Sequence, residues 1–212
     1  MRVLMCGDGA RLTTGFGRVN RKIGERLANM PDVEVFAITS LDAPPYARSS
    51  WYVDRGINPI HTQTARAVGI ELLPETMALY RPDVMLVVGD PATARTWMQV
   101  LDATEYATTP VVAYMPVEGG PIATGILAAF ERATVAITMT EWGADEVVTS
   151  SDHKLTRPSV FYHGVDRSVF HPVEPQARAQ LRDAMGWSDK FVVSYVARNS
   201  WRKSYDRLLK AA

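Results

Sequence analysis

Short apolar runs alternate with amphipathic stretches along most of this chain. The apolar runs are rich in Val, Ile and aromatic residues and lack polar alternation, which is typical of strands buried on both faces of a parallel sheet. They lie at Arg2–Cys6, Val33–Thr39, Val84–Val88, Val111–Tyr114, Val135–Met139 and Ser159–Tyr162. Because strands that alternate with helices build βαβ units, the pattern predicts an α/β fold with a Rossmann-like parallel sheet flanked by helices.

Helical periodicity fills the intervals between these strands. Val19, Ile23 and Leu27 recur every four residues and form one apolar stripe. Helices are predicted at Arg18–Ala28, Thr64–Tyr80, Ala92–Leu101, Ile122–Phe130 and Glu141–Thr149, with a break or kink at Pro74. Leu41–Gln63 has weak periodicity and contains three prolines, so we expect it to be irregular.

The composition changes after residue 162 and predicts a domain boundary. Residues 163–176 form a turn-rich, non-periodic stretch that contains His163, Gly164 and Asp166, and we interpret it as an interdomain hinge. A helix at Ala177–Met185, a strand at Phe191–Ala197 and a helix at Arg202–Ala212 are predicted to follow. A lone βα unit cannot bury its own apolar faces. We therefore interpret residues 177–212 as the beginning of an incomplete second Rossmann-like domain, through which the chain could form a homodimer.

Composition narrows the class of protein. The chain has 212 residues, of which 47% are hydrophobic and 22% charged, the balance of a soluble globular protein. No apolar run approaches the ~20 residues of a membrane span and no signal peptide is visible, so we expect a cytoplasmic protein without a transmembrane segment. The single cysteine, Cys6, excludes an internal disulfide and is expected to lie in the core. The four histidines lack metal-ligand spacing, so no metal site is expected.

Charge is balanced overall but unevenly distributed. There are 23 basic and 23 acidic residues; residues 1–30 carry six basic and two acidic ones, and residues 176–212 carry eight and three. The remaining stretch, 31–175, carries nine basic against 18 acidic residues. This distribution disfavours a continuous nucleic-acid-binding face. It is compatible either with local anion sites near both ends or with solvated helix faces of random sign.

The first predicted strand is followed by a glycine-rich loop. A dinucleotide-binding fingerprint that starts at Gly7 and Gly9 would need a third glycine at position 12, which is Leu12, so that motif fails. Gly15 and Gly17 remain, directly at a helix N-terminus. Because glycine lets backbone N–H groups approach an anion and the helix dipole favours negative charge there, we predict contact with a phosphate or a sugar. The alternative is a loop without a ligand.

A second basic loop follows the strand predicted at Phe191–Ala197. Arg198 leaves that strand, and Lys203 lies in the first predicted helical turn, where an acidic residue is the usual choice. A di-anionic group between the two side chains would explain this placement. A solvated basic helix start is the alternative.

Several of these segments resemble family 4 glycosyltransferases, whose fold is GT-B. The run 161–166 with Phe170 and Pro172 is similar to their interdomain motif, and 191–199 with Arg202, Lys203 and 208–211 is similar to the start of their donor domain. Thr140–Gly143 and Tyr114–Gly119 are similar to loops of the acceptor domain, the latter in phage and archaeal members. The resemblance covers nearly the whole chain, as an N-terminal GT-B domain plus the start of the donor domain.

The resemblance implies sugar transfer from a UDP- or GDP-linked nucleotide-sugar donor, with retention and without a metal or cofactor. By position, Gly15 and Gly17 would approach the donor diphosphate. Arg198 and Lys203 would hold its phosphates and stabilise the departing charge. The acceptor stays open: a glycan, a lipid, a protein or a nucleic-acid base.

Two departures from the family pattern weaken the catalytic assignment. The paired glutamates of the family belong further into the donor domain, beyond residue 212, so we expect this chain alone to be inactive. A histidine that many members carry after the strand at Val84–Val88 is replaced here by Gly89-Asp90-Pro91. Asp90 is therefore a candidate sugar contact or catalytic residue, or else a turn or helix-capping aspartate.

Other residues of the middle region admit two interpretations each. Glu118, beside Gly119 and Gly120, is a candidate acceptor contact, sugar contact or catalytic residue, or else a turn residue. Trp51 and Tyr52 would form either an acceptor platform or part of the core. At the level of the whole chain, the alternative to a transferase is a non-catalytic binding or assembly protein that retains a truncated GT-B fold; a nucleotide-binding flavodoxin-like module is a third possibility.

Overall fold

A computed structural model describes residues 1–38, 49–62, 68–197 and 199–211. Its centre is a sheet in which every neighbouring pair of strands is parallel, in the order β3-β2-β1-β4-β5-β6-β7. The strands are β1 (Arg2–Gly7), β2 (Glu34–Ile38), β3 (Ile57–Ile60), β4 (Val84–Val88), β5 (Val111–Tyr114), β6 (Val135–Thr138) and β7 (Ser159–Val160). The predicted Rossmann-like parallel sheet is thereby confirmed.

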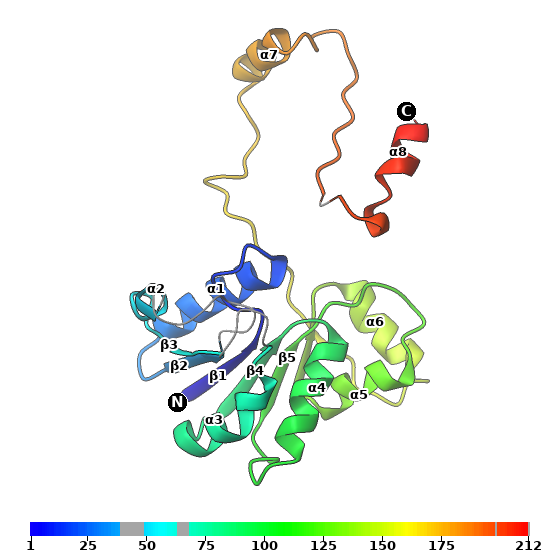
Figure 1. The fold of residues 1–212 in the computed structure, drawn as a ribbon. Coiled ribbons are helices and arrows are strands. Elements are labelled where there is room, and N and C mark those ends of the chain that lie inside the picture. Colours follow the sequence, from blue (N-terminus) through cyan, green and yellow to red (C-terminus); the bar gives the residue numbers. More distant parts are fainter. Residues whose placement is uncertain (39–48, 63–67, 198, 212) are drawn as a thin grey trace. The chain divides into compact units, whose positions relative to one another are not determined.

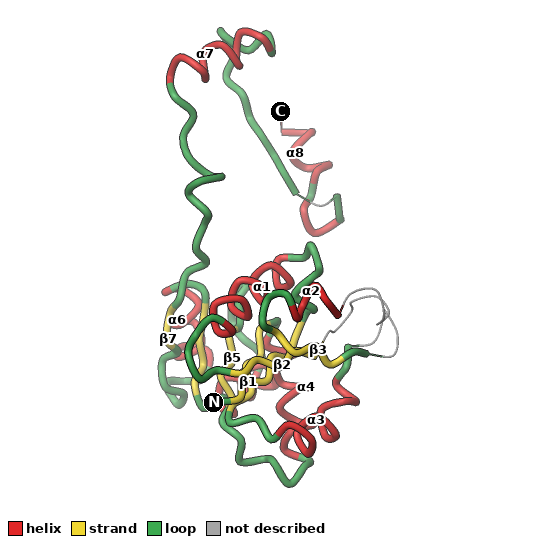
Figure 2. The backbone as a smooth tube through the Cα atoms, turned by 90° about the vertical axis from the view of Figure 1, so that its left-hand side faces the viewer, coloured by secondary structure: helices red, strands yellow, loops and turns green. Residues whose placement is uncertain are grey.

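Helices cover the sheet unequally on its two faces (Figures 1 and 2). One face packs against α3 (Leu73–Tyr80), α4 (Pro91–Asp102), α5 (Thr124–Arg132) and α6 (Glu141–Ser150). The other packs against only α1 (Gly15–Ala28) and the short α2 (Ser49–Val53). Successive strand residues serve opposite faces: Cys6 belongs to the first core and Met5 to the second. Cys6 is fully buried, as expected, and burial raises the pKa of its thiol.

The strand order creates a switch point between β1 and β4. The connections that follow these two neighbouring strands lead to α1 on one face and to α4 on the other, which leaves a crevice at their carboxyl ends. Gly7 ends β1 opposite Val88, the last residue of β4. A Cβ at Gly7 would lie 2.3 Å from the Val88 carbonyl oxygen, and its φ of 129° is also unfavourable for other residues. Only glycine allows the two strands to end this closely together.

The segment predicted to be irregular, Leu41–Gln63, contains two regular elements, so that prediction is wrong in part. Residues 49–53 form α2 and residues 57–60 form β3, whereas 41–48 and 63 lie outside the described residues. β3 is the edge strand, and an edge strand tolerates Pro59 because the proline's missing N–H is not needed by a further strand. The sequence pattern failed here because Asn58 and Pro59 interrupt the apolar run of this strand.

The helix predicted at Thr64–Tyr80 is shorter than expected. A 3₁₀ turn at Ile70–Leu72 leads into α3, and residues 64–67 lie outside the described part, as does Thr39 after β2. Pro74 stands in the first turn of α3, where its missing N–H costs no helical hydrogen bond. The predicted break at Pro74 is therefore found, as the boundary between the 3₁₀ turn and α3, and no kink within α3 is needed.

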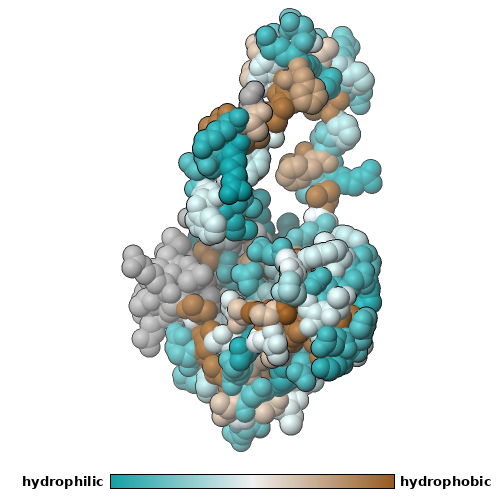
Figure 3. Space-filling model, turned by 90° about the vertical axis from the view of Figure 1, so that its right-hand side faces the viewer, coloured by the Kyte–Doolittle hydropathy of each residue, from teal (hydrophilic) through white to brown (hydrophobic). Residues whose placement is uncertain are grey.

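Residues Gly164–Ala212 form a second compact unit, separate from Met1–His163. It contains α7 (Pro175–Ala184), a 3₁₀ turn at Trp201–Lys203 and α8 (Tyr205–Ala211). The strand predicted at Phe191–Ala197 is wrong: no strand occurs among the described residues of this unit, and Ala197 bonds through its N–H and C=O to the Tyr205 hydroxyl instead. The helix predicted from Arg202 begins only at Tyr205. Without a neighbouring strand or core, apolar side chains such as Phe191 and Val196 are exposed. Figure 3 shows hydrophobic (brown) atoms open on the surface of this unit.

No helix in the described part of the chain is long and apolar enough to cross a membrane.

Candidate functional site

The β1–α1 loop is held by a chain of side-chain hydrogen bonds. The Thr14 hydroxyl donates to Asp8 Oδ2 at 2.6 Å and accepts from the N–H of Gly17 at 3.0 Å. Thr14 is thus the N-cap of α1, and the Asp8 carboxylate fixes the orientation of its hydroxyl. Asn20 Nδ2 donates to the Asp8 carbonyl oxygen at 2.7 Å. Residues that the sequence separates by up to twelve positions therefore form one rigid loop at the carboxyl end of β1.

The two glycines predicted to contact a ligand have different surroundings. Gly15 is exposed, and a Cβ added there would meet no described atom within 4 Å. Gly17 is buried, and a Cβ there would lie 2.6 Å from the Leu12 carbonyl oxygen and 3.0 Å from that of Gly9. Gly17 is accordingly required for packing the loop onto α1, and its N–H already bonds Thr14. Gly15 is the glycine whose backbone is open to a ligand.

Asn20 is a positioning residue that sequence reasoning missed. It is 4% exposed, and its Oδ1 has no hydrogen-bond partner among the described residues. It borders a cavity of about 10 Å³ together with Gly7 and Asp8, which is about the space that one water molecule requires. The signal in the sequence is a polar residue on the apolar face of the amphipathic helix α1, because a buried amide needs partners.

A cavity of about 340 Å³ lies at the carboxyl ends of β4 and β5. Asp90, which follows β4, and Glu118, which follows β5, both border it. The rest of its lining is mainly apolar and proline-rich, from Pro116, Pro121, Ile122 and Phe130. The structure thus brings together the two acidic residues that the sequence analysis singled out separately. An apolar pocket with a few convergent polar groups is the usual form of a small-molecule site.

Asp90 occupies the N-cap position of α4 without acting as a side-chain cap. Its carbonyl oxygen accepts the N–H of Ala94 at 2.9 Å, but its carboxylate makes no capping hydrogen bond to α4, which the structure describes in full. The predicted alternative of a helix-capping aspartate is therefore wrong for the side chain. The residue is exposed and stands at the N-terminal, positive end of the dipole of α4.

The loop that carries Glu118 is fixed to α6 by two residues that the sequence did not single out. Ser150 accepts the N–H of Ile122 at 2.8 Å and donates to Glu146 Oε1 at 2.6 Å. A Cβ at Gly120 would lie 2.3 Å from that same Glu146 oxygen, so the loop backbone passes directly over the carboxylate. These contacts join segments about thirty residues apart, and no local sequence pattern could have revealed them.

The aromatic residues of α2 do not form the platform considered for an acceptor. Tyr52 is fully buried in the core, so the packing interpretation is correct for it. Trp51 is half-buried beneath the guanidinium of Arg55, whose Cζ lies 4.1 Å from the ring centroid. Arg11, in the β1–α1 loop, lies 6.0 Å from the same ring. The Trp51 ring therefore makes cation–π contacts with the guanidinium groups of Arg55 and Arg11, next to the β1–α1 loop.

The remaining predicted site residues lie at the junction and in the C-terminal unit. His163 closes the first unit, with its ring 5.5 Å from that of Tyr114. Asp166 accepts the N–H and the hydroxyl of Ser168 in a turn, and Gly164 has open space at its Cβ. Lys203 ends a 3₁₀ turn, where its carbonyl oxygen accepts the Tyr195 hydroxyl. Arg198 lies outside the described residues, so its pairing with Lys203 stays a prediction.

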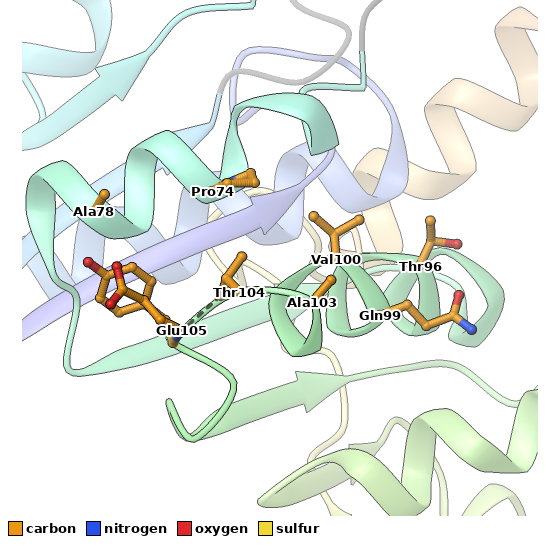
Figure 4. A pocket seen from close by; sticks show the side chains of 9 residues that line it. Pro74, Ala78, Thr96, Gln99, Val100, Ala103, Thr104 and Glu105 are labelled. Atoms are coloured by element: carbon orange, nitrogen blue, oxygen red, sulfur yellow. Dashed lines mark hydrogen bonds between the residues drawn. The ribbon is translucent and has the colours of Figure 1, made fainter.

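A larger groove, of about 490 Å³, lies between α3 and α4 (Figure 4). Pro74 and Ala78 face it from α3, and Thr104 and Glu105 close it after the C-terminus of α4. That end of α4 leads back to the amino edge of the sheet, away from the carboxyl ends of the strands. This groove is therefore at the opposite edge of the sheet from the cavity of Asp90 and Glu118.

Within the described residues, no group of three His, Cys, Asp or Glu side chains is placed to hold a metal ion.

Comparison with known proteins gives little beyond the fold. No protein-family model matches the chain, and no curated protein matches it. A solved structure of UDP-GlcNAc 2-epimerase from Methanocaldococcus jannaschii is similar over 77% of this chain, with 13% identity and a TM-score of 0.46. The match spans 45% of the length of that protein. At this level of similarity no residue role is transferred from it.

Proposed function

We propose that the chain contributes the acceptor-side half of a sugar-transfer site that uses a nucleotide-sugar donor. The observation that carries the proposal is the convergence of Asp90 and Glu118 on one cavity at the carboxyl ends of β4 and β5. Sugars and other polyols present hydroxyl donors, and ionised carboxylates are acceptors only. Two carboxylates above an apolar floor therefore suit the binding of a hydroxylated acceptor.

In this proposal the carboxylates orient an acceptor hydroxyl and accept its proton as the new glycosidic bond forms. The donor diphosphate would lie at the start of α1, beside the exposed backbone of Gly15. The β1–α1 loop is at the carboxyl edge of the sheet, as is the cavity of Asp90 and Glu118. Arg198 and Lys203 would stabilise the charge on the departing phosphate. Transfer with retention and without a metal is the outcome that the resemblance to family 4 glycosyltransferases implies.

A titration of the 212-residue chain with UDP-glucose and GDP-mannose, followed by amide NMR shifts, tests the proposal. We expect shifts at Gly15 and Gly119, with affinity no tighter than about millimolar, because charge-assisted bonds without a base pocket leave little surplus over the cost of association. In a parallel titration with a glycan acceptor, Asp90→Asn and Glu118→Gln should each weaken binding of the acceptor at least about threefold, the loss of one modest hydrogen bond. Glu105→Gln, in the groove between α3 and α4, is the matched control.

Shifts confined to the groove between α3 and α4, or equal binding by all variants, would contradict the proposal. The same samples distinguish the alternative of a binding or assembly protein, which has one structural observation in its favour: no described residue of Gly164–Ala212 is buried. Release of nucleoside diphosphate in the presence of glycan acceptors indicates transfer. Because this chain alone is expected to be inactive under either function, the absence of any donor-induced shift at Gly15 is the result that supports the non-catalytic alternative.

A further inference from the structure

The α1 face of the sheet carries an apolar groove of about 460 Å³. Its floor is formed by side chains of neighbouring strands and its wall by α1; the lining includes Leu86, Val112, Ile137 and Phe161, with Ile23 and Leu27 from α1. Every lining residue is apolar apart from the phenol of Tyr114, whose hydroxyl already donates to the Phe161 carbonyl oxygen at 2.6 Å. The groove is therefore built to be covered by an apolar surface.

Parallel sheets are normally covered by helices on both faces. The opposite face of β5 and β6 carries α4, α5 and α6, whereas no helix among the described residues covers the α1 face of these two strands (Figures 1 and 2). Phe161 is 60% exposed and Val135 is 42% exposed as a result. A further helix that packed on this face of the sheet beside α1 would occupy the groove.

Charge at the rim specifies the kind of helix that fits. Arg18, Lys22 and Arg26 are exposed and spaced four residues apart, so they form one basic stripe along α1. On the helical wheel this stripe borders Ile23 and Leu27 on their solvent side. The one acidic residue of α1, Glu25, pairs with Arg55 at 3.1 Å and with Lys22 of the stripe at 3.6 Å. Because α1 holds no second acidic residue, Arg18 and Arg26 leave the stripe with a net positive charge.

We propose that this groove binds an amphipathic helix whose apolar stripe is flanked by Asp and Glu residues, supplied by a partner protein. An apolar stripe would fill the groove, and the acidic flank would meet Arg18, Lys22 and Arg26 in the manner of known helix-in-groove recognition. Residues 164–212 contain nine basic and five acidic residues, so they do not supply this charge. The inference concerns a different surface from the cavity of Asp90 and Glu118 and does not depend on the proposed function.

The test uses the full chain and two synthetic peptides of about 16 residues, a helix of ~24 Å. Both carry the same leucine stripe; one is flanked by glutamates and the other by lysines. Calorimetric titration should show binding of the glutamate peptide with a negative heat-capacity change, the mark of apolar burial. The lysine peptide should bind at least about tenfold more weakly, because several exposed charge pairs change sign.

Variants then locate the binding surface. Charge reversal of the stripe by Arg18→Glu, Lys22→Glu and Arg26→Glu should lower the affinity for the glutamate peptide at least about tenfold. The same variant should bind the lysine peptide more tightly than the glutamate peptide. Phe161→Lys should weaken the binding of both peptides. Circular dichroism verifies that each variant is folded. Reversal of three exposed residues elsewhere, Lys154→Glu, Arg207→Glu and Lys210→Glu, has the same change in net charge and should leave the preference unchanged.

Three outcomes would overturn the proposal. Equal affinities for the two peptides, or no binding of either peptide, would contradict recognition of an acidic helix by the basic stripe. Concentration-dependent dimerisation in sedimentation velocity that Phe161→Lys abolishes would assign the groove to a second copy of the chain. Uptake onto phosphatidylserine-containing vesicles that the stripe reversal abolishes, without peptide binding, would assign the surface to a membrane.

Discussion

The two glycines in the first turn of α1, Gly15 and Gly17, have different physical roles. Gly15 and Gly17 look equivalent in the sequence, since both stand at a helix start after a strand. The structure distinguishes them by what a Cβ would touch: open space at Gly15 and two backbone carbonyl oxygens of the β1–α1 loop at Gly17. Backbone atoms cannot move aside as a flexible side chain can, so the second position tolerates no side chain.

This difference predicts opposite effects of the same substitution. Gly17→Ala should destabilise the fold by about 1–3 kcal/mol, the usual cost of overpacking. Gly15→Ala should be neutral or stabilising by up to about 1 kcal/mol, because alanine restricts the unfolded chain and favours helix. Urea unfolding of both variants measures the difference. Equal stability of the two would show that the loop relaxes around the added methyl group.

Tyr114 links the sheet to the segment that leaves it. Its hydroxyl donates to the Phe161 carbonyl oxygen at 2.6 Å, and burial raises the pKa of the phenol above its ordinary value of 10.0. Tyr114→Phe should cost about 1 kcal/mol at neutral pH, through loss of that hydrogen bond.

The raised pKa of Tyr114 gives this difference a pH dependence. Because the folded-state value exceeds the unfolded one, the contribution is complete below pH 10 and is lost as pH rises through the folded-state pKa. The gap in unfolding free energy between wild type and Tyr114→Phe should therefore narrow above pH 10. A gap that widens with pH would mean that the phenolate is stabilised in the folded protein.

At the scale of elements, the carboxyl edge of the sheet depends on contacts between loops and helices. The loop that carries Glu118 is fixed to α6 through Ser150, which accepts from Ile122 and donates to Glu146. Ser150→Ala leaves the Ile122 N–H and the Glu146 carboxylate without this partner. We expect a loss of about 1–2 kcal/mol in stability and faster amide exchange across 116–123.

The serine that caps the C-terminus of the same helix, Ser151, provides the control for that experiment. Ser151 donates to the Val148 carbonyl oxygen within α6 and accepts from Leu155, so its contacts do not reach the loop of Glu118. Ser151→Ala should leave exchange in 116–123 unchanged whatever it does to overall stability. Equal loop exchange in the two variants would show that Ser150 does not hold the loop.

The strands that could be predicted from sequence are those with uninterrupted apolar runs. Strands such as β4 and β5 were placed correctly because continuous Val-rich runs have no other stable location than a covered sheet. β3 was missed because four residues with a proline show no periodicity, and its strand state depends on pairing with β2. Phe191–Ala197 has the opposite error: strong β-propensity forms no strand without a neighbour to pair with.

The candidate site was predictable by residue but not by geometry. Asp90 and Glu118 each follow an apolar run, and parallel strands end at one edge, which is why acidic residues after two strands could be singled out. That they line the same cavity follows from β4 and β5 being neighbours in the sheet. The support from Asn20, Glu146 and Ser150 depends on tertiary contacts, which a single sequence does not contain.

At the scale of the whole molecule, the two units differ in what stabilises them. Met1–His163 has two apolar cores, one on each face of its sheet. Gly164–Ala212 contains no buried residue among those described, and three of its large apolar side chains, Phe191, Val196 and Trp201, are more than nine-tenths exposed. Ordering each residue costs about 1–2 kcal/mol of conformational entropy, which apolar burial must offset. Burial of this kind is present in the first unit alone.

Amide hydrogen exchange should therefore divide the chain at the boundary between the units. Amides of β1, β4 and β5 should exchange only with global unfolding, and helical amides of α7 and α8 should exchange close to unprotected rates, because local opening there exposes no core. Shortening the chain to residues 1–163 should leave the midpoint of thermal unfolding unchanged, since no buried residue is removed. Strong protection in α7, or a midpoint lowered by several degrees in the shortened chain, would show instead that the C-terminal unit buries apolar surface in solution. A second measurement, sedimentation velocity across a range of concentrations, would then decide whether that burial is within one chain or between two copies.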